Sequence, residues 1–333
     1  MAEKVVLGLS DGVDSAVAAR VLLSEGYDVF GLYLDIGGER ERADALDSAR
    51  RLGIPLRVLP IREELEKSVC APFARAYLSG KTPNPCIGCN PNVKFPALCR
   101  CADELAATFI ATGHYAVCDR RHIYMGNPDN DQSYMLARLT DEQVSRLLLP
   151  LGAYEKARVR EIAREMGLTV ADKPDSRENC FIRGMSYADW IESREGVPGE
   201  GPAVFRGAEI GRHSGIHRYT VGQRWPEMIG DRRAYVRAIR ADRNEIELCL
   251  WEDLFQREFH VSDAHWMRFS PDTPFRARVR VRHTRWETPE CTVFPAEGGA
   301  RVVADEPLRA PAPGQAAAFY RDTMLLGGGY IEP

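Results

Sequence analysis

Short apolar runs alternate with amphipathic segments through the first third of the chain. Residues 5–9 form an apolar run typical of a buried strand, and Val13, Val17 and Val21 follow it at helical spacing. The alternation continues with apolar runs at 29–34, 56–59 and 109–112, separated by helical patterns at 42–52 and 63–78. This βαβα order predicts an α/β domain, in which helices cover both faces of a parallel sheet and ligands bind at the carboxyl ends of its strands.

The second half of the chain has a different texture. Residues 142–167 have a helical pattern, and residues 172–181 form a polar segment rich in turn formers. Residues 196–215 are dense in glycine and proline, and short alternating runs after residue 259 predict a small β domain. We therefore expect three domains, with the boundaries 1–192, 193–258 and 259–333.

Composition narrows the class of protein. With 333 residues, 44% of them apolar and 28% charged, the chain can bury two or three cores, which excludes disordered, collagen-like and disulfide-scaffold proteins. No run approaches the roughly 18 apolar residues of a membrane span, and the first residues do not have the pattern of a cleaved signal. The nine cysteines are an odd number, which favours reduced thiols. We expect a cytoplasmic protein.

A glycine-containing loop separates the first predicted strand from the first predicted helix. It has the sequence G-L-S-D-G-V-D-S, residues 8–15. Backbone N–H groups at a helix N-terminus and the hydroxyls of Ser10 and Ser15 suit a phosphate or pyrophosphate. The loop has no Walker A lysine. The alternative interpretation is that Ser10 or Asp11 only caps the helix.

This loop resembles the S-G-G-x-D-S motif of the PP-loop ATP pyrophosphatases. The resemblance implies an enzyme that splits ATP between its α and β phosphates and adenylates a substrate. Asp11 stands where that family has glycine.

Two cysteines lie in the segment T-P-N-P-C-I-G-C-N, residues 82–90. Its prolines, glycine and asparagines predict a loop, followed by a helix that Asn90 caps and Pro91 opens. Cys89 would then lie at the positive end of that helix, with Lys94 in the first turn, and both would increase its thiolate fraction. Cys89 is thus a candidate nucleophile or sulfur carrier, although C-x-x-C also occurs in redox pairs and in halves of metal sites.

A third candidate thiol, Cys180, lies in the polar segment 175–181. Together with Cys86 and Cys89 it could complete an iron–sulfur site such as a [4Fe-4S] cluster. We expect the remaining six thiols to be small, buried and inert: Cys70, Cys99, Cys101, Cys118, Cys249 and Cys291.

Arginines recur at alternate positions from Arg276 to Arg282, with Arg285 close behind. On a strand these side chains would project from one face. Such a stripe in a net-acidic chain favours a surface that follows RNA phosphates, the alternative being an ordinary solvated face. A second cluster extends this basic character: Arg232, Arg233, Arg237, Arg240 and Arg243.

Several motifs occur in one order along nearly the whole chain. Besides the two described they are A-T-G-H-Y-A at 111–116, D-Q-S-Y at 131–134, D-S with N-C-F-I at 175–182, Y-T-V-G-Q-R at 219–224, P-G-Q at 313–315 and G-G-G at 327–329. Together they closely resemble the bacterial tRNA-specific 2-thiouridylase family. The resemblance implies ATP-dependent thiolation of the wobble uridine in tRNAs for Lys, Glu and Gln. It also implies a PP-loop catalytic domain, a central tRNA-binding domain and a C-terminal β-barrel.

The resemblance also implies roles for individual residues. Cys89 would carry a persulfide received from a donor protein, and Cys180 would be its partner cysteine, with a transient disulfide between them. Asp14 is the expected contact of Mg²⁺. The residues expected to bind ATP are Gly8, Leu9, Ser10, Asp11, Gly12, Val13, Asp14, Ser15, Leu34 and Gly113. The residues expected to bind tRNA are Asn84, Pro85, Cys86, His114, Asn130, Asp131, Gln132, Arg280, Val281 and Gln315.

The implied chemistry has two stages. A uracil oxygen attacks the α-phosphate, and sulfur then displaces the resulting AMP from C2; the base must leave its stack to reach such a site. Two other functions remain open. The chain could adenylate a small molecule, as amide-forming synthetases do, or it could be a paralogue that binds tRNA with lost or altered catalysis.

Overall fold

The computed structural model describes residues 2–173, 179–283 and 288–333. The chain divides into two compact units. Unit 1 comprises Met1–Ser68, Cys86–Arg177 and Asp322–Leu326, and unit 2 comprises Val69–Pro85, Glu178–Arg321 and Gly327–Pro333. Asp175 and Ser176 of the fifth motif and Arg285 of the arginine stripe lie outside the described residues.

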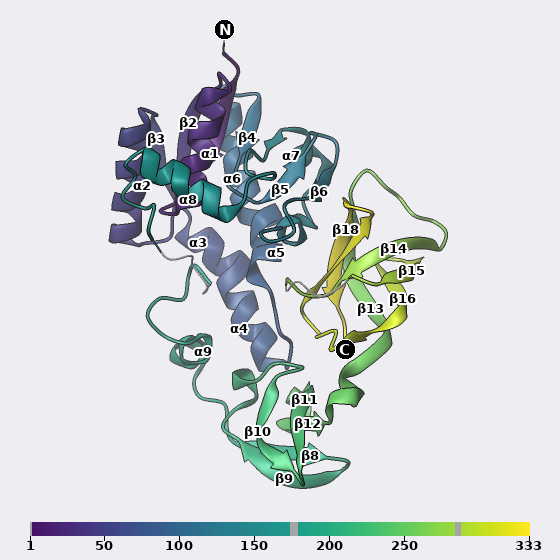
Figure 1. Ribbon diagram of the computed structural model, residues 1–333. Helices are drawn as coiled ribbons and strands as arrows, with labels where there is room; N and C mark the ends of the chain where they lie inside the picture. Colours follow the sequence, from purple (N-terminus) through teal and green to yellow (C-terminus); the bar gives the residue numbers. More distant parts are fainter. Residues whose placement is uncertain (1, 174–178, 284–287) are drawn as a thin grey trace. The chain divides into compact units, whose positions relative to one another are not determined.

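Unit 1 contains the predicted parallel sheet, with strand order β3-β2-β1-β4-β7 (Figure 1). Its strands are β1 Lys4–Gly8, β2 Asp28–Asp35, β3 Leu56–Pro60, β4 Phe109–Ala111 and β7 Leu147–Leu148. All neighbouring pairs run parallel. The prediction from the alternating pattern is confirmed.

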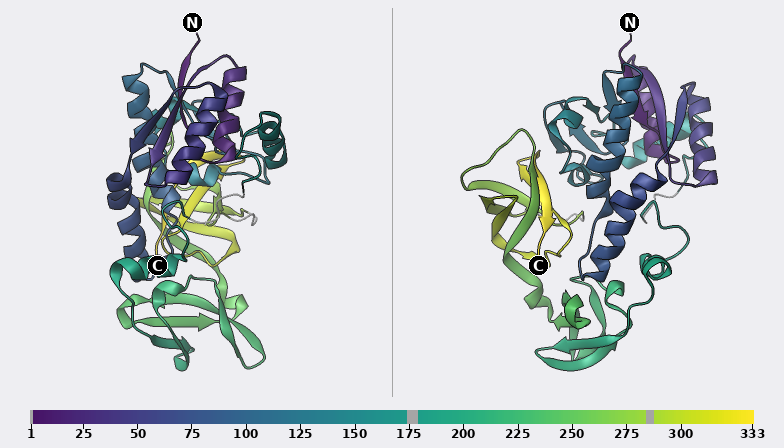
Figure 2. Two further views of the ribbon diagram at one scale, coloured as in Figure 1. Left: turned by 90° about the vertical axis from the view of Figure 1, so that its left-hand side faces the viewer. Right: turned by 180° about the vertical axis from the view of Figure 1, so that it is seen from behind.

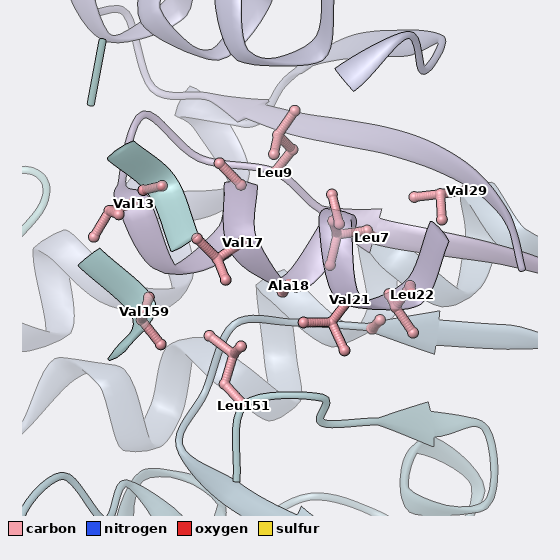
Figure 3. Packing of buried hydrophobic residues seen from close by; sticks show 14 of the residues in the cluster. Leu7, Leu9, Val13, Val17, Ala18, Val21, Leu22, Val29, Leu151 and Val159 are labelled. Atoms are coloured by element: carbon pink, nitrogen blue, oxygen red, sulfur yellow. The ribbon is translucent and has the colours of Figure 1, made fainter. Parts of the chain in front are cut away.

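Helices cover both faces of this sheet because successive side chains of β1 point in opposite directions. Leu7 belongs to a buried cluster with Val17 and Val21 of α1, Val13–Ser24, and with Val159 of α8, Lys156–Glu165 (Figure 3). The next residue, Gly8, faces the other way, where an added Cβ would meet Leu98 of α6, Phe95–Glu104, at 3.6 Å. The helix α2, Glu39–Leu52, packs beside α1.

The single helix expected over residues 142–167 is wrong. The structure has α7 Asp141–Ser145, then β7, then α8. Thr140 and Gln143 form a capping box that starts α7, and Pro150 cannot continue a helix. Gly152 lies so close to β5, Ala116–Cys118, that a Cβ there would be 2.2 Å from the Ala116 carbonyl oxygen. The hairpin partner of β5 is β6, Ile123–Met125.

Unit 2 contains two β structures and the helices α4, Ala71–Leu78, and α9, Tyr187–Glu195. The first is a five-stranded sheet in the order β10-β11-β12-β8-β9, drawn in green in Figure 2. Trp225, Val236 and Leu248 lie in its buried core. Its strands are β8 Gly201–Phe205, β9 Ala208–His213, β10 Arg224–Ile229, β11 Arg232–Arg240 and β12 Glu245–Cys249.

The second β structure is the expected C-terminal barrel, in the strand order β13-β16-β15-β14-β17-β18. Residues 324–326, at the start of β18, belong to unit 1, where the same sheet continues through β6 and β5. It closes because β13 pairs with both β16 and β18. Gly327 makes the closure tight, since a Cβ there would lie 2.1 Å from the His265 carbonyl oxygen. The strands are β13 Phe255–Trp266, β14 Phe275–Arg280, β15 Glu290–Ala296, β16 Gly299–Arg309, β17 Ala316–Arg321 and β18 Met324–Ile331. Within the described ranges, no helix has both the length and the apolar character needed to span a bilayer.

Candidate active site

The loop between β1 and α1 is braced by hydrogen bonds to its own hydroxyl groups. The Ser10 N–H donates to Ser15 Oγ at 3.0 Å, and the Gly12 N–H donates to Ser10 Oγ at 3.1 Å. The N-cap of α1 is Gly12, which makes no side-chain cap, so the interpretation of Ser10 or Asp11 as a plain helix cap is wrong. The first N–H groups of α1 therefore have no side-chain acceptor at the cap, as an anion site at a helix N-terminus requires.

Gly113 lies against this loop at the end of β4. A Cβ at Gly113 would be 2.9 Å from both the Asp14 carbonyl carbon and the Ser15 nitrogen. Because both atoms belong to the backbone, they cannot swing aside as a flexible side chain would. Leu34 is near the carboxyl end of β2, where it pairs with Leu59 of β3. The expected ATP-binding residues of β1, β2 and β4 thus lie at the predicted edge of the sheet.

Asp14 has partners that the sequence reasoning missed. Lys156 Nζ donates to both carboxylate oxygens of Asp14 at 2.7 Å, and the Tyr115 hydroxyl donates to Oδ1 at 2.6 Å. A carboxylate engaged by an ammonium and a phenol is a poor ligand for Mg²⁺. Asp14 therefore anchors the first turn of α1 to α8 and to the segment after β4.

A second lysine, Lys173, lies beside Asp11 and contacts its carboxylate at 2.5 Å. Lys156 and Lys173 lie far in sequence from the loop, so no local pattern predicts these contacts. One signal was available: the chain has only six lysines among its 44 basic residues. The rarity of lysine makes its positions more informative than those of arginine.

The two cysteines of the C-x-x-C segment are helical, which corrects the expected loop. Pro85–Cys89 forms α5, and a π-helical turn over Asn90–Lys94 leads into α6. Proline is well suited to the first position of a helix, and the π turn accommodates Pro91 inside the helical run. Asn90 is not a cap, because it lies inside the helical run and its side-chain oxygen accepts no hydrogen bond from the described residues; its amide nitrogen donates to the Met135 carbonyl at 2.7 Å.

Cys89 therefore lies inside the helical run rather than at a helix N-terminus. Its backbone angles are helical, φ −63° and ψ −44°. The expected activation of Cys89 by the positive end of a helix is wrong for this reason. Cys89 is partly buried, and Cys86, one helical turn before it, is exposed.

Cys180 is also exposed, and it belongs to unit 2. Its neighbour Phe181 is anchored by ring contacts to Phe73 of α4, at 5.3 Å between centroids, and to Trp190 of α9, at 5.1 Å. Cys89 belongs to unit 1, so a meeting of these two thiols stays a prediction.

Of the six thiols expected to be inert, four are buried, and Cys99 and Cys118 are partly exposed. Burial raises the pKa of Cys118 and of Cys249 to about 11 and that of Cys291 to about 12. These three thiols are almost fully protonated at neutral pH, which makes them poor nucleophiles.

Comparison with known proteins identifies the chain's relatives. Residues 3–184 match a family model described as the tRNA methyl transferase HUP domain, residues 195–249 its PRC-barrel domain, and residues 256–331 an aminomethyltransferase β-barrel domain. A protein of Syntrophotalea carbinolica named tRNA-specific 2-thiouridylase MnmA is 39% identical over 98% of both chains. Proteins of the same name from Acetivibrio thermocellus and Clostridioides difficile are each 37% identical over at least 99% of both chains.

The chain belongs to the tRNA-specific 2-thiouridylase family.

In this thiouridylase-family chain, part of the expected tRNA surface also serves the fold. Asp131 is buried, and its carboxylate accepts from the Gly126 N–H at 2.8 Å, the Ser133 N–H at 3.1 Å and the Ser133 hydroxyl at 2.9 Å. The Gln132 side-chain oxygen accepts from the Tyr115 N–H at 3.1 Å, and the Gln132 N–H donates to the Tyr115 carbonyl at 2.7 Å. This turn, with Asn130 at its start, therefore supports the tyrosine that holds Asp14.

His114 lies next to Gly113 and stacks on Phe95, with 6.3 Å between ring centroids. Its Nδ1 shares a hydrogen bond of 2.7 Å with the Thr112 hydroxyl. Burial and the nearby Lys94 ammonium hold the pKa of His114 well below its ordinary value, so the imidazole is neutral. A neutral ring suits a hydrogen bond to a base better than an ion pair with a phosphate.

Two of the thiouridylase motifs lie side by side in unit 2. The Gln315 amide donates to the Thr82 carbonyl at 2.9 Å, and the Thr82 N–H donates to the Pro313 carbonyl at 2.7 Å. Gly314 makes this approach possible, since a Cβ there would be 2.9 Å from Lys81 Cβ. The segment that leads to Asn84 and Pro85 is thus tied to the C-terminal barrel.

The arginine stripe alternates as predicted, but its side chains have partners within the fold. Arg276 pairs with Asp305 at 2.5 Å, and Arg282 donates to the Val221 and Ala310 carbonyls at 2.7 and 3.0 Å. Arg280 donates to the His283 carbonyl at 2.6 Å. Val281 is only 7% exposed, so its side chain offers little surface to RNA.

No group of three or more candidate ligands in the described ranges could hold a metal ion. A [4Fe-4S] cluster on Cys86, Cys89 and Cys180 would need residues of both units, so it stays a prediction, as does a contact of Asp14 with Mg²⁺.

Proposed function

We propose that the chain catalyses ATP-dependent 2-thiolation of the wobble uridine of tRNA. The activity borne in the names of its full-length relatives supports this assignment. The structural observation that carries the proposal is the anion cradle between β1 and α1, backed by Gly113 at the carboxyl edge of the parallel sheet. The division of labour among domains bounded at residues 192 and 258 stays a prediction.

The first step activates the base. The C2 oxygen of the uracil is a poor leaving group, so it attacks the α-phosphate of ATP and releases pyrophosphate, which leaves AMP on that oxygen. The N–H groups of the cradle, with Ser10 and Ser15, would bind the phosphates. The fold already holds these backbone donors in position, so they need not reorganise during the reaction. The neutral His114 would face the extruded base as a hydrogen-bonding partner.

The second step transfers sulfur. Attack of the Cys180 thiolate on the inner sulfur of a Cys89 persulfide releases the terminal sulfur as hydrosulfide and leaves a Cys89–Cys180 disulfide, which a thiol reductant must then reduce. The hydrosulfide attacks C2, and AMP leaves with the C2 oxygen. The persulfide comes from a donor protein, and the expected substrates are the tRNAs for Lys, Glu and Gln.

The test is a thiolation assay with the full chain. Unmodified tRNA, ATP and a persulfide source are incubated with the protein, and 2-thiouridine is measured by nucleoside mass spectrometry. We expect product only with ATP, and none from a Cys89→Ala or a Cys180→Ala variant. Cys118→Ala is the matched control, because burial raises the pKa of Cys118 to about 11 and keeps this thiol unreactive.

Other outcomes would favour the competing functions. Thiolation without ATP, or unaffected by Cys89→Ala, would refute the mechanism. Pyrophosphate release in the absence of tRNA would favour adenylation of a small molecule. Tight tRNA binding with no turnover would favour a paralogue that has lost catalysis.

A further inference from the structure

We call residues 8–15, between β1 and α1, the nucleotide loop. Asp11 places a carboxylate in this loop at a position where the PP-loop motif has glycine. The backbone accepts the exchange, because Asp11 is not among the described residues with positive φ. The unfavourable effect is therefore electrostatic. A negative charge beside the cradle opposes the binding of the phosphates of ATP.

Lys173 lies where it can offset this charge. Its ammonium contacts the Asp11 carboxylate at 2.5 Å and the carboxylate of Asp44, on α2, at 3.0 Å. All three side chains are less than one-third exposed, so solvent screens them less than it screens surface pairs. Partial burial alone would lower the pKa of Lys173, but the hydrogen bonds to Asp11 and Asp44 raise it, and the ammonium stays charged.

The backbone of Lys173 is also fixed. Arg160 of α8 donates to the Ala171 carbonyl at 2.8 Å and to the Lys173 carbonyl at 2.9 Å. Asp11 and Lys173 are 162 positions apart in the sequence, yet both are held in place from unit 1. Contacts of both its side chain and its backbone therefore hold Lys173 beside the nucleotide loop.

We infer that Lys173 is a positioning residue that allows an aspartate in the nucleotide loop, by cancelling its charge next to the phosphates of ATP. The inference rests on the proposed function, since it takes this loop to bind ATP. On this inference, the ammonium of Lys173 offsets the charge of Asp11, and the replacement of glycine by Asp11 is not a sign of lost catalysis.

Charge compensation predicts effects of opposite sign. In the full chain, Lys173→Met leaves Asp11 uncompensated and should weaken ATP binding by at least about tenfold, the scale expected for one charge near a phosphate. Asp11→Asn leaves Lys173 paired with Asp44 alone, which changes the net charge of the three side chains from −1 to zero, and should tighten ATP binding. The double variant keeps the net charge of −1 and should return to within about threefold of the wild type. Lys67→Met, on an exposed lysine of unit 1, is the control for general charge.

ATP affinity is measured by titration calorimetry, with the unfolding temperature of every variant measured alongside. A double variant that binds ATP as weakly as Lys173→Met would overturn the inference, and so would weaker binding by Asp11→Asn. The Asp11→Asn variant retains Lys173, so its direction decides the matter even where Lys173→Met fails to fold. A wild-type chain that does not bind ATP would instead refute the proposed function.

Discussion

The close approach of Gly113 to the nucleotide loop gives the sharpest quantitative prediction. In a Gly113→Ala variant the new methyl group would lie 2.9 Å from the Asp14 carbonyl carbon and from the Ser15 nitrogen. Ordinary van der Waals contacts begin near 3.4 Å, so the first turn of α1 or the end of β4 must move by several tenths of an ångström. Neither neighbour is a flexible side chain, so the backbone itself must shift.

Such overpacking costs about 1–3 kcal/mol. The moved atoms carry the N–H groups of the cradle, so part of this cost falls on ATP binding. If all of it did, ATP affinity would fall by between about 5-fold and 150-fold, at about 1.4 kcal/mol per factor of ten. Titration calorimetry with ATP measures the loss of affinity, and thermal unfolding measures the loss of stability.

The matched control is Gly199→Ala, because nothing lies within 4 Å of its added Cβ. This control should bind ATP as the wild type does. A Gly113→Ala variant with unchanged ATP affinity and unchanged unfolding temperature would refute the steric reasoning. A loss of stability with intact ATP affinity would keep the steric reasoning but reject this loop as the nucleotide site.

Three further predictions concern the surrounding structure. Tyr115→Phe removes the 2.6 Å hydrogen bond to Asp14 and should cost about 1–3 kcal/mol of unfolding free energy in urea titrations, whereas an unchanged value would mean that Lys156 alone holds Asp14. Asp131→Ala leaves the Gly126 and Ser133 donors without their acceptor and should cost more than Asp131→Asn in the same assay, with equal losses contradicting the structural role. The hydrogen bond from His217, together with Arg218, lowers the pKa of Glu192 below its ordinary 4.5, so its stabilisation is complete above that pH and is lost as the pH falls through the lowered value. Glu192→Gln should therefore flatten the loss of thermal stability below pH 4.5, and an unaltered profile would contradict this.

Local sequence patterns predicted most of the fold. The β1–α1–β2 alternation, the loop between β1 and α1 and a C-terminal β domain follow from patterns within ten to twenty residues, and the structure has each of them. That the C-terminal domain is a closed barrel was implied by the family resemblance. The expected helix over 142–167 failed because Pro150 and a close approach at Gly152 interrupt a pattern that remains amphipathic on both sides.

The candidate site was less predictable, because its decisive contacts join distant parts of the chain. Lys156 reaches Asp14 across 142 positions, and no single-sequence pattern predicts such a pair. The prediction of a loop at Cys86 and Cys89 was wrong for another reason. Pro83 and Pro85 suggested a loop, but only Pro83 lies outside the helical run, because Pro85 stands at the first position of α5, where proline is tolerated.

The way the chain passes between its two units has a consequence for biosynthesis. Unit 1 is assembled from three separate stretches, and the last of them, Asp322–Leu326, is translated long after the other two; its Met324 pairs with Tyr124 of β6. Nascent chains usually fold domain by domain from the N-terminus. Here the ribosome must add more than 140 residues after Arg177 before unit 1 has all its parts. A fragment ending at residue 192 or 258 would lack that stretch, so dissection of this enzyme calls for point substitutions rather than truncation.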